Sequence, residues 1–225
     1  MARKGNSRHM NRFAASKYMR IDRKVSTYVT KQNPGRHTLE NSIALVTLLK
    51  EKMGVAADSR EAGILIKNGN VLINGKQVRD KRYPVGFGDM ITLKPTGASY
   101  RIDVAKKGAI RVDDKPTTDR YVKVIGKYLG KKNKVMLRLY DGSVLEGKNE
   151  VKVNDSVAVK DNAVKSIVKF SSGARCYVIK GTHASESGTI KGINTGTATR
   201  ASTVEVDSGK GTFLTLVDNV MVIGE

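Results

Sequence analysis

Lysine and arginine are the side chains of this sequence that most clearly indicate a chemical role, which is the binding of negative charge. There are 41 of them against 21 aspartates and glutamates, which gives a formal net charge of +20. Such a density of fixed positive charge attracts a polyanion, and nucleic acid fits it better than an anionic membrane surface. No apolar run approaches the roughly 18 residues that a membrane-spanning helix needs. The charge therefore predicts a nucleic-acid-binding protein.

The residue types that usually carry catalysis form no recognisable set. Asp113 and Asp114 precede a Lys-Pro pair, so we interpret them as part of a turn. Cys176 is the single cysteine, and its apolar neighbours favour a buried hydrophobe in a protein of the reducing cytoplasm. The three histidines are scattered and show no metal-ligand spacing; they are His9, His37 and His183. We expect no enzyme, cofactor, metal or small-molecule substrate.

Basic residues are densest in residues 1–37, which carry ten of them against one acid, Asp22, for a net charge of +9. Apolar residues are too sparse there to form a core, so we expect an arm that is disordered alone and orders against RNA phosphates. Phe13, Tyr18, Met19 and Tyr28 are available for stacking or packing. A solvated tail or a localisation signal is the alternative, and the lack of an apolar core predicts no secretory signal. The arm residues predicted to bind RNA are Arg3, Lys4, Arg8, His9, Arg12, Lys17, Arg20, Arg23, Lys24 and Arg36.

Two helices are predicted after the arm. Thr38 caps the first, which runs to about Met53. Its apolar positions at helical spacing are Leu39, Ile43, Val46, Leu49 and Met53. Asp58 and Glu61 form a capping box for the second helix, and Gly69 stands where a left-handed end is required. Both helices are expected to pack on a small sheet.

That sheet is predicted from a hairpin and a closing strand. Residues 71–73 form a strand, Asn74-Gly75 suits a type I′ turn, and Val78 begins the return strand. A last strand covers residues 90–93, directly after Gly88-Asp89. The polar residues of this module predicted to contact RNA are Ser59, Arg60, Lys67, Asn68, Lys76, Arg79, Lys81 and Arg82.

The order of helix, hairpin and Gly-Asp strand resembles the small RNA-binding module named after bacterial small-subunit ribosomal protein four. The resemblance implies that a helix face and a turn are presented to RNA, which is recognised by shape more than by sequence. Gly63 and Ile64 occupy helix positions where related modules often carry basic residues. The contact face is therefore expected to be narrower here.

Short β-like runs fill residues 98–170 and predict a small barrel or sandwich. Two turns stand out between them, Lys106-Lys107-Gly108 and Asp141-Gly142, the second a type I′ candidate. Lysines gather in the loop at Lys127, Lys131, Lys132 and Lys134. Phosphate contact and simple solvent exposure are equally good interpretations of that cluster.

The last stretch, residues 173–225, resembles a KOW motif that opens an SH3-like barrel. Gly181 and Gly188 match the first and last glycines of the motif, and Ile190 matches its apolar position. Ser185 stands where the middle glycine is usual, and lysines common in the motif are missing. Whether this loop contacts RNA or protein stays open.

Taken in order, these segments resemble the archaeal and eukaryotic small-subunit ribosomal protein "four-e" family over the full chain. Residues 34–39 and 83–89 match family signatures, and residues 219–224 match its last strand. Eukaryotic members generally carry a further basic tail, so a chain stopping at Gly224-Glu225 favours an archaeal source. The resemblance implies a structural constituent of the small subunit that binds its rRNA, beside neighbouring ribosomal proteins, in the cytoplasm.

The expected fold class is α+β, mostly β: a helix-hairpin module, a β-barrel-like central domain and an SH3-like KOW barrel. The predicted domains are the arm (1–37), the module (38–95), the central domain (96–171) and the KOW barrel (172–225). Two other functions remain open. The chain could be a free or transcription-associated KOW factor, or, less well supported, an RNA-modifying enzyme, although no stretch has room for a catalytic domain.

Overall fold

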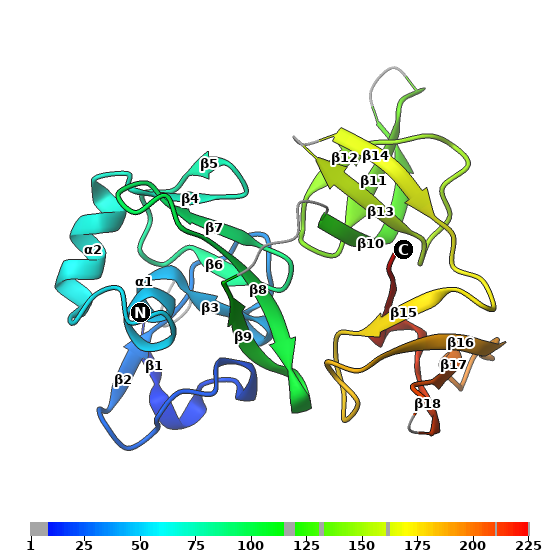
Figure 1. The fold of residues 1–225 in the computed structure, drawn as a ribbon, viewed down its shortest axis with the longest axis horizontal. Coiled ribbons are helices and arrows are strands. Elements are labelled where there is room, and N and C mark those ends of the chain that lie inside the picture. Colours follow the sequence, from blue (N-terminus) through cyan, green and yellow to red (C-terminus); the bar gives the residue numbers. More distant parts are fainter. Residues whose placement is uncertain (1–8, 115–119, 131–132, 161–162, 210, 225) are drawn as a thin grey trace, which may run out of the picture. The chain divides into compact units, whose positions relative to one another are not determined.

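The computed structural model describes residues 9–114, 120–130, 133–160, 163–209 and 211–224, with the side chains of residues 9 and 160 left aside. It divides into two compact units. Unit 1 comprises Met1–Asp103 and Ala109–Pro116, and unit 2 comprises Val104–Gly108 and Thr117–Glu225 (Figure 1). The fold is α+β and mostly β, as predicted. Among the described residues, no helix has the length and apolar character needed to cross a membrane.

A five-stranded sheet of order β5-β4-β7-β8-β9 forms the frame of unit 1 (Figure 1). Its strands are β4 (Val71–Ile73), β5 (Lys76–Gln77), β7 (Met90–Leu93), β8 (Ser99–Ala105) and β9 (Ala109–Asp113). The hairpin is confirmed, because Asn74 and Gly75 both have positive φ, at 52° and 77°. Between β8 and β9, Lys107 and Gly108 also adopt positive φ in the predicted turn.

The sheet crosses the boundary predicted at residue 95. Pro95 and Gly97 form only a tight turn, in which the Leu93 N–H donates to the Ala98 carbonyl. The chain then returns as β8, which pairs antiparallel with β7 so that Ile91 lies opposite Tyr100. Turn residues alone do not distinguish a domain end from a hairpin, so β8 and β9 were assigned to the central domain although they extend the sheet of the module.

The helix predicted from Thr38 to Met53 is wrong over its first half. Ser42–Ala44 is instead a strand, β3, paired antiparallel with β6 (Pro84–Gly86) so that Ile43 lies opposite Val85. Helix begins only at α1 (Leu45–Thr47) and continues as a π-helical turn over Leu48–Lys52. The apolar residues correctly indicated a buried segment, since residues 42–49 are all buried. A fully buried segment can, however, be a strand as well as a helix.

The second helix, α2 (Ser59–Lys67), begins and ends where predicted. Asp58 is the N-cap residue, but its side chain makes no capping hydrogen bond. Glu61 instead accepts from the Ala57 N–H at 2.8 Å, one residue before the expected partner. At the other end, the Gly69 and Asn70 N–H groups donate to the Ile66 and Leu65 carbonyls, which is a Schellman motif with Gly69 at φ 75°.

The N-terminal segment is folded from residue 9 onward, in contrast to the disordered arm predicted from composition. β1 (His9–Asn11) pairs with β2 (Tyr28–Thr30), and single 3-10 turns cover Arg12–Ala14 and Lys17–Met19. The segment does not build a core of its own. Its few apolar side chains complete the core of unit 1, where Met10, Tyr18, Met19 and Val29 are buried.

A buried ion pair fixes this segment to the π-helical turn. Both terminal guanidinium nitrogens of Arg12 donate to the two carboxylate oxygens of Glu51, at 2.9 and 2.8 Å. Arg12 also donates from Nε to the Asp22 carbonyl at 2.7 Å. Its side chain is only 7 % exposed. This corrects the prediction that Arg12 binds RNA, because its hydrogen-bonding groups face the protein interior.

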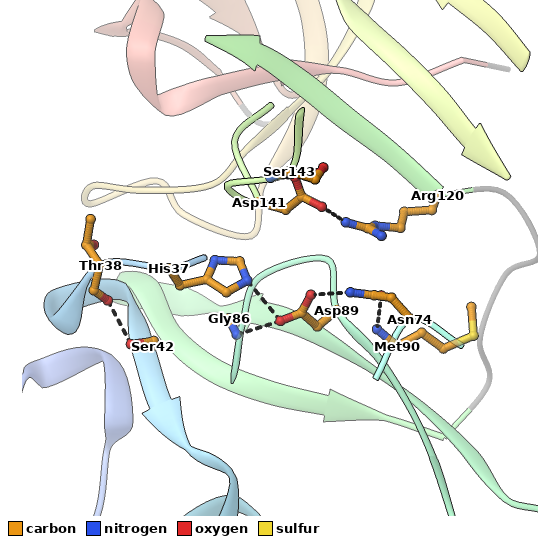
Figure 2. Close-up of polar contacts among 10 residues, drawn as sticks. All are labelled: His37, Thr38, Ser42, Asn74, Gly86, Asp89, Met90, Arg120, Asp141 and Ser143. Atoms are coloured by element: carbon orange, nitrogen blue, oxygen red, sulfur yellow. Dashed lines mark hydrogen bonds and ion pairs between the residues drawn. The ribbon is translucent and has the colours of Figure 1, made fainter. Parts of the chain in front are cut away.

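Unit 2 contains two further five-stranded sheets. The first has the order β12-β11-β10-β13-β14 and encloses a core of valines and leucines that includes Val124, Leu137 and Val157. Its strands are β10 (Arg120–Leu129), β11 (Val135–Leu139), β12 (Val144–Glu146), β13 (Ser156–Lys160) and β14 (Ala163–Val168). Of the two residues in the predicted type I′ turn, only Gly142 has positive φ, so the turn is of another type. The Asp141 side chain is buried and accepts hydrogen bonds from Arg120 and from the Ser143 N–H (Figure 2).

The second sheet has the order β18-β17-β16-β15-β19 and encloses the core of the C-terminal barrel. Its strands are β15 (Arg175–Val178), β16 (Ser187–Asn194), β17 (Thr203–Asp207), β18 (Thr212–Leu216) and β19 (Val220–Val222). Cys176 is fully buried in this core, and burial raises its thiol pKa to about 11. The prediction that it is a buried hydrophobe is confirmed.

Lys123 joins the two sheets of unit 2. Its ammonium donates to the Val217 carbonyl at 2.6 Å, from a side chain on β10 to the turn before β19. Burial lowers the pKa of Lys123 to about 8, against the opposing effect of Asp218. A buried lysine bonded to a backbone carbonyl is a structural contact, so Lys123 is not available to a phosphate.

Replacing Arg12 by leucine should lower the free energy of unfolding by about 3 kcal/mol, because Glu51 is left without its partner in a largely buried position. Urea denaturation of the full chain measures the change. Lys17→Ala is the matched control, since Lys17 is exposed on the same segment and its loss should cost under about 0.5 kcal/mol. Equal stability of the two variants would contradict the docked segment.

Candidate nucleic-acid interface

A buried carboxylate organises the part of unit 1 that carries the predicted RNA contacts. Asp89 is fully buried between β6 and β7. It accepts hydrogen bonds from His37 Nε2 at 2.8 Å, from the Gly86 N–H at 3.1 Å and from Asn74 Nδ2 at 2.7 Å (Figure 2). Asn74 in turn accepts from the Met90 N–H at 3.0 Å. One side chain thus joins the N-terminal segment, the hairpin turn and the closing strand.

The electrostatics of Asp89 follow from these partners. Burial by itself would raise its pKa, but hydrogen bonds and charge from His37, with those from Gly86 and Asn74, hold the pKa below its usual value. Gly86 is required for this arrangement, because a Cβ there would lie 2.6 Å from the His37 ring. Asp89 therefore stays ionised while completely enclosed.

The helix and hairpin held by this network present basic side chains to solvent. On α2, Arg60, Ile64 and Lys67 follow one another at helical spacing on the exposed face. Ile64 is 55 % exposed and a Cβ at Gly63 would meet nothing within 4 Å, so both positions lie on an open face to which they add no charge. The other predicted residues of the module that are exposed are Ser59, Asn68, Lys76, Arg79 and Lys81.

The loop that follows the hairpin is also held from the N-terminal segment. The Asn33 N–H donates to the Arg82 carbonyl at 2.9 Å, and its side-chain amide donates to Asp80 at 2.8 Å. Asp80 also accepts from the Arg82 N–H at 2.9 Å. The loop is thereby fixed with Arg79 and Lys81 exposed on it, while Arg82 is half-buried and makes interactions of its own.

Apart from the buried Arg12, the predicted contacts in the N-terminal segment fall into three groups. Lys17, Arg20 and Lys24 are exposed. Arg23 and Arg36 are half-buried, and Arg23 donates to the Phe13 and Ala15 carbonyls. The remaining positions, Arg3, Lys4, Arg8 and the side chain of His9, lie outside the described residues.

The lysine cluster of the central sheet has internal partners where it is described. Lys127 donates to the Asn149 and Val151 carbonyls, and Lys134 pairs with Glu146 at 2.8 Å. Lys131 and Lys132 lie outside the described residues. Within the described ranges, no group of three or more acidic, histidine or cysteine side chains is arranged to hold a metal ion.

Sequence reasoning missed the two side chains that fix the interface. Asp89 was part of a recognised signature and His37 stood in a basic arm, but their contact spans 52 positions. Ser185, by contrast, stands at a position where the motif usually has glycine, and that position predicts a left-handed backbone conformation. It adopts φ 75°, the conformation that the usual middle glycine of the motif would supply without strain.

Comparison with known proteins gives matches over the whole chain. The family model of the S4 domain matches residues 45–91, and that of ribosomal family S4e matches residues 96–164. Small ribosomal subunit protein eS4 of Methanosphaera stadtmanae is 34% identical over 100% of this chain and 95% of that protein. The eS4 protein of Archaeoglobus fulgidus is 33% identical over 96% of this chain and 93% of its own length. This chain belongs to the eS4 family.

A solved eS4-family structure has the same fold. The crystal structure of 30S ribosomal protein S4e from Thermoplasma acidophilum superimposes with a TM-score of 0.70 at 29% identity, covering 82% of this chain and 95% of that one. The family resemblance seen in the sequence is thus confirmed, and its relatives here are archaeal, as expected. The S4 match begins at Leu45, where helix begins, and ends at Ile91 in β7.

Replacing Asp89 by asparagine should lower the free energy of unfolding of this eS4 protein by about 2 kcal/mol at pH 7, because charge-assisted hydrogen bonds are lost in a buried site. The folded-state pKa of Asp89 lies below its unfolded-state value of about 3.9. The stabilisation is therefore complete above about pH 4 and is lost as the pH falls through the folded-state pKa.

Urea unfolding at a series of pH values from 7 to 3 measures this dependence. The difference between the wild type and Asp89→Asn should shrink below about pH 4. Asp58→Asn is the matched control, because Asp58 is exposed and makes no capping bond with its side chain. A difference between wild type and Asp89→Asn that stays constant with pH would show that ionised Asp89 contributes nothing.

Proposed function

We propose that this eS4-family protein is a structural constituent of the small ribosomal subunit and binds small-subunit rRNA through α2, the hairpin loop and the N-terminal segment. The observation that carries the proposal is the exposure of Arg60, Lys67, Lys76, Arg79 and Lys81 on elements joined by the buried Asp89 network. We further propose that it acts in the cytoplasm, in the ribosome, without catalysing a reaction.

Binding by such a surface follows from counterion release and preorganisation. Each lysine or arginine that neutralises a phosphate releases condensed counterions, which gives sequence-independent affinity that falls with salt. The backbone of the hairpin and of its following loop is already held by Asn74, Asp89 and Asn33. The backbone of these segments therefore loses little conformational entropy when RNA binds, so a smaller part of the contact free energy is offset.

The shape of RNA fits this arrangement better than a sequence code does. An A-form helix offers a shallow minor groove and a regular phosphate spacing, which rigid basic side chains can match without reading bases. The exposed apolar side chain of Ile64 lies between Arg60 and Lys67 on the same face of α2. The proposed contact is therefore with a folded rRNA region rather than with a single-stranded sequence.

Alanine at Arg60, Lys67 or Arg79 should weaken binding to a small-subunit rRNA transcript and reduce the slope of log K against log salt by about one each. Fluorescence anisotropy over a range of salt concentrations measures both. Arg200→Ala is the matched control, because Arg200 is equally exposed but lies in the C-terminal barrel. Slopes unchanged in all three variants would refute the role of this surface.

The N-terminal contribution is tested by removing only residues 1–8, because the segment from Met10 onward supplies core side chains. The deletion removes Arg3, Lys4 and Arg8 and should reduce the salt slope by about three while leaving the unfolding midpoint nearly unchanged. A longer deletion to Gly35 would instead destabilise unit 1. An unchanged salt slope would show that residues 1–8 make no phosphate contacts and that RNA binding depends on residues from 9 onward.

Sedimentation separates the ribosomal role from that of a free or transcription-associated factor. The protein should remain with small subunits through a high-salt wash, whereas recovery mainly off ribosomes would favour the factor. An RNA-modifying role would require turnover of rRNA by the purified chain.

A further inference from the structure

The charge of this chain is distributed very unevenly between its domains. Residues 173–225 contain five lysines and arginines and five aspartates and glutamates, so the C-terminal barrel has a formal charge of zero. The net charge of +20 therefore lies entirely in the preceding residues. A neutral barrel has no electrostatic reason to bind a phosphate backbone, so a different kind of partner has to be considered for it.

The outer face of β18 carries large apolar side chains in solvent. Along β18, Phe213 packs on the barrel core, while Leu214 and Leu216 point away from it with 62 % and 43 % of their surface exposed. Phe213 is in addition covered by a stacked His183 ring, with centroids 4.0 Å apart. The leucines have no such cover, and exposed leucines on neighbouring outward positions are uncommon outside interaction surfaces.

β18 is also an end strand of its sheet, paired with β17 on one side. Its sequence, Thr-Phe-Leu-Thr-Leu, contains no proline and no charged residue. Natural proteins usually protect exposed edge strands with such residues, because an unprotected edge accepts another strand. The edge of β18 is thus suited to pairing with an extended segment of a partner.

The surroundings of the leucines indicate the chemistry of that partner. In register, Leu214 lies beside Glu205 of β17, and Leu216 lies beside Thr203. Within the described residues, Glu205 has no ion-pair partner, and the exposed Asp218 follows two residues after the strand. Lys191 of β16 also reaches this strand, because its ammonium pairs with Asp207 at 3.0 Å and lies 3.4 Å from Thr212 Oγ1. Glu205 is thus the carboxylate beside Leu214 that is left to attract a lysine or arginine carried by an apolar strand.

We propose that the β18 surface, formed by Leu214, Leu216 and Glu205, docks an extended basic segment of a neighbouring protein of the small subunit by strand addition. A second copy of this chain is disfavoured because each copy carries +20, and RNA is disfavoured by the unpaired Glu205 and the two apolar side chains. This inference rests on the proposed ribosomal role and assigns its protein contact to a domain without net charge.

The test places a photo-crosslinking amino acid, benzoylphenylalanine, at Leu214 in cells and analyses purified, salt-washed small subunits. Thr189 is the matched control position, because it is exposed on β16, away from the end strand. The expected result is a crosslink from Leu214, and none from Thr189, to a single ribosomal protein at a segment rich in lysine or arginine. A crosslink to rRNA, to a second copy or to nothing would overturn the proposal.

A double variant, Leu214→Lys with Leu216→Lys, makes the test quantitative. Both side chains are exposed, so the thermal midpoint should be unchanged, while the crosslinked protein should fall roughly tenfold in subunits that contain the variant. Unchanged stoichiometry would overturn the docking site. If the wild-type chain itself does not sediment with small subunits, the proposed function fails; if it does and only Leu214 gives no protein crosslink, the docking inference alone fails.

Discussion

The Asp89 carboxylate is the constraint on which the rest of unit 1 depends. It is fully enclosed and charged, and it can be so only because donors from three separate parts of the chain converge on it. A carboxylate in such a place penalises every arrangement in which one donor is missing, so it selects a single relative position for the hairpin, β7 and His37. The exposed arginines and lysines of α2 and the hairpin loop are then displayed on a frame whose parts are held together by hydrogen bonds to Asp89.

Within the eS4 family fold, this chain divides two tasks between regions of different charge. Unit 1 carries the exposed basic residues of α2 and the hairpin loop, to which the proposed phosphate contacts are assigned. The C-terminal barrel is neutral and packs tightly around Cys176 and its valine neighbours, with apolar side chains left outside on β18. An assembly of RNA and protein needs both kinds of surface, because charge gives attraction at a distance while apolar contact gives a defined partner.

Local features were predictable from the sequence, and long-range ones were not. Asn74-Gly75 fixed the hairpin and Gly69 fixed the end of α2, because each acts through its own backbone conformation. The strand at Ile43 was predicted as helix, since its pairing with Val85 is invisible to local periodicity. Arg12 was assigned to RNA for the same reason: its partner Glu51 lies far along the chain, and composition alone cannot tell a buried arginine from an exposed one. The sequence accordingly identified basic residues that are exposed, such as Arg60 and Arg79, and missed the contact between His37 and Asp89 behind them. That the exposed residues bind RNA stays a prediction.

The docked N-terminal segment has a consequence for the synthesis of the protein. Translation produces residues 9–30 first, yet the 3-10 turn at Lys17–Met19 contacts β3 and β9, and β9 ends at Asp113. The turn that contains Met19 therefore cannot complete its contacts until about half of the chain, through Asp113, has been synthesised. During that interval it is a strongly cationic peptide close to the RNA of the translating ribosome. The order of synthesis therefore sets the order of folding here, since Arg12 can be neutralised by Glu51 only after 39 further residues have been added.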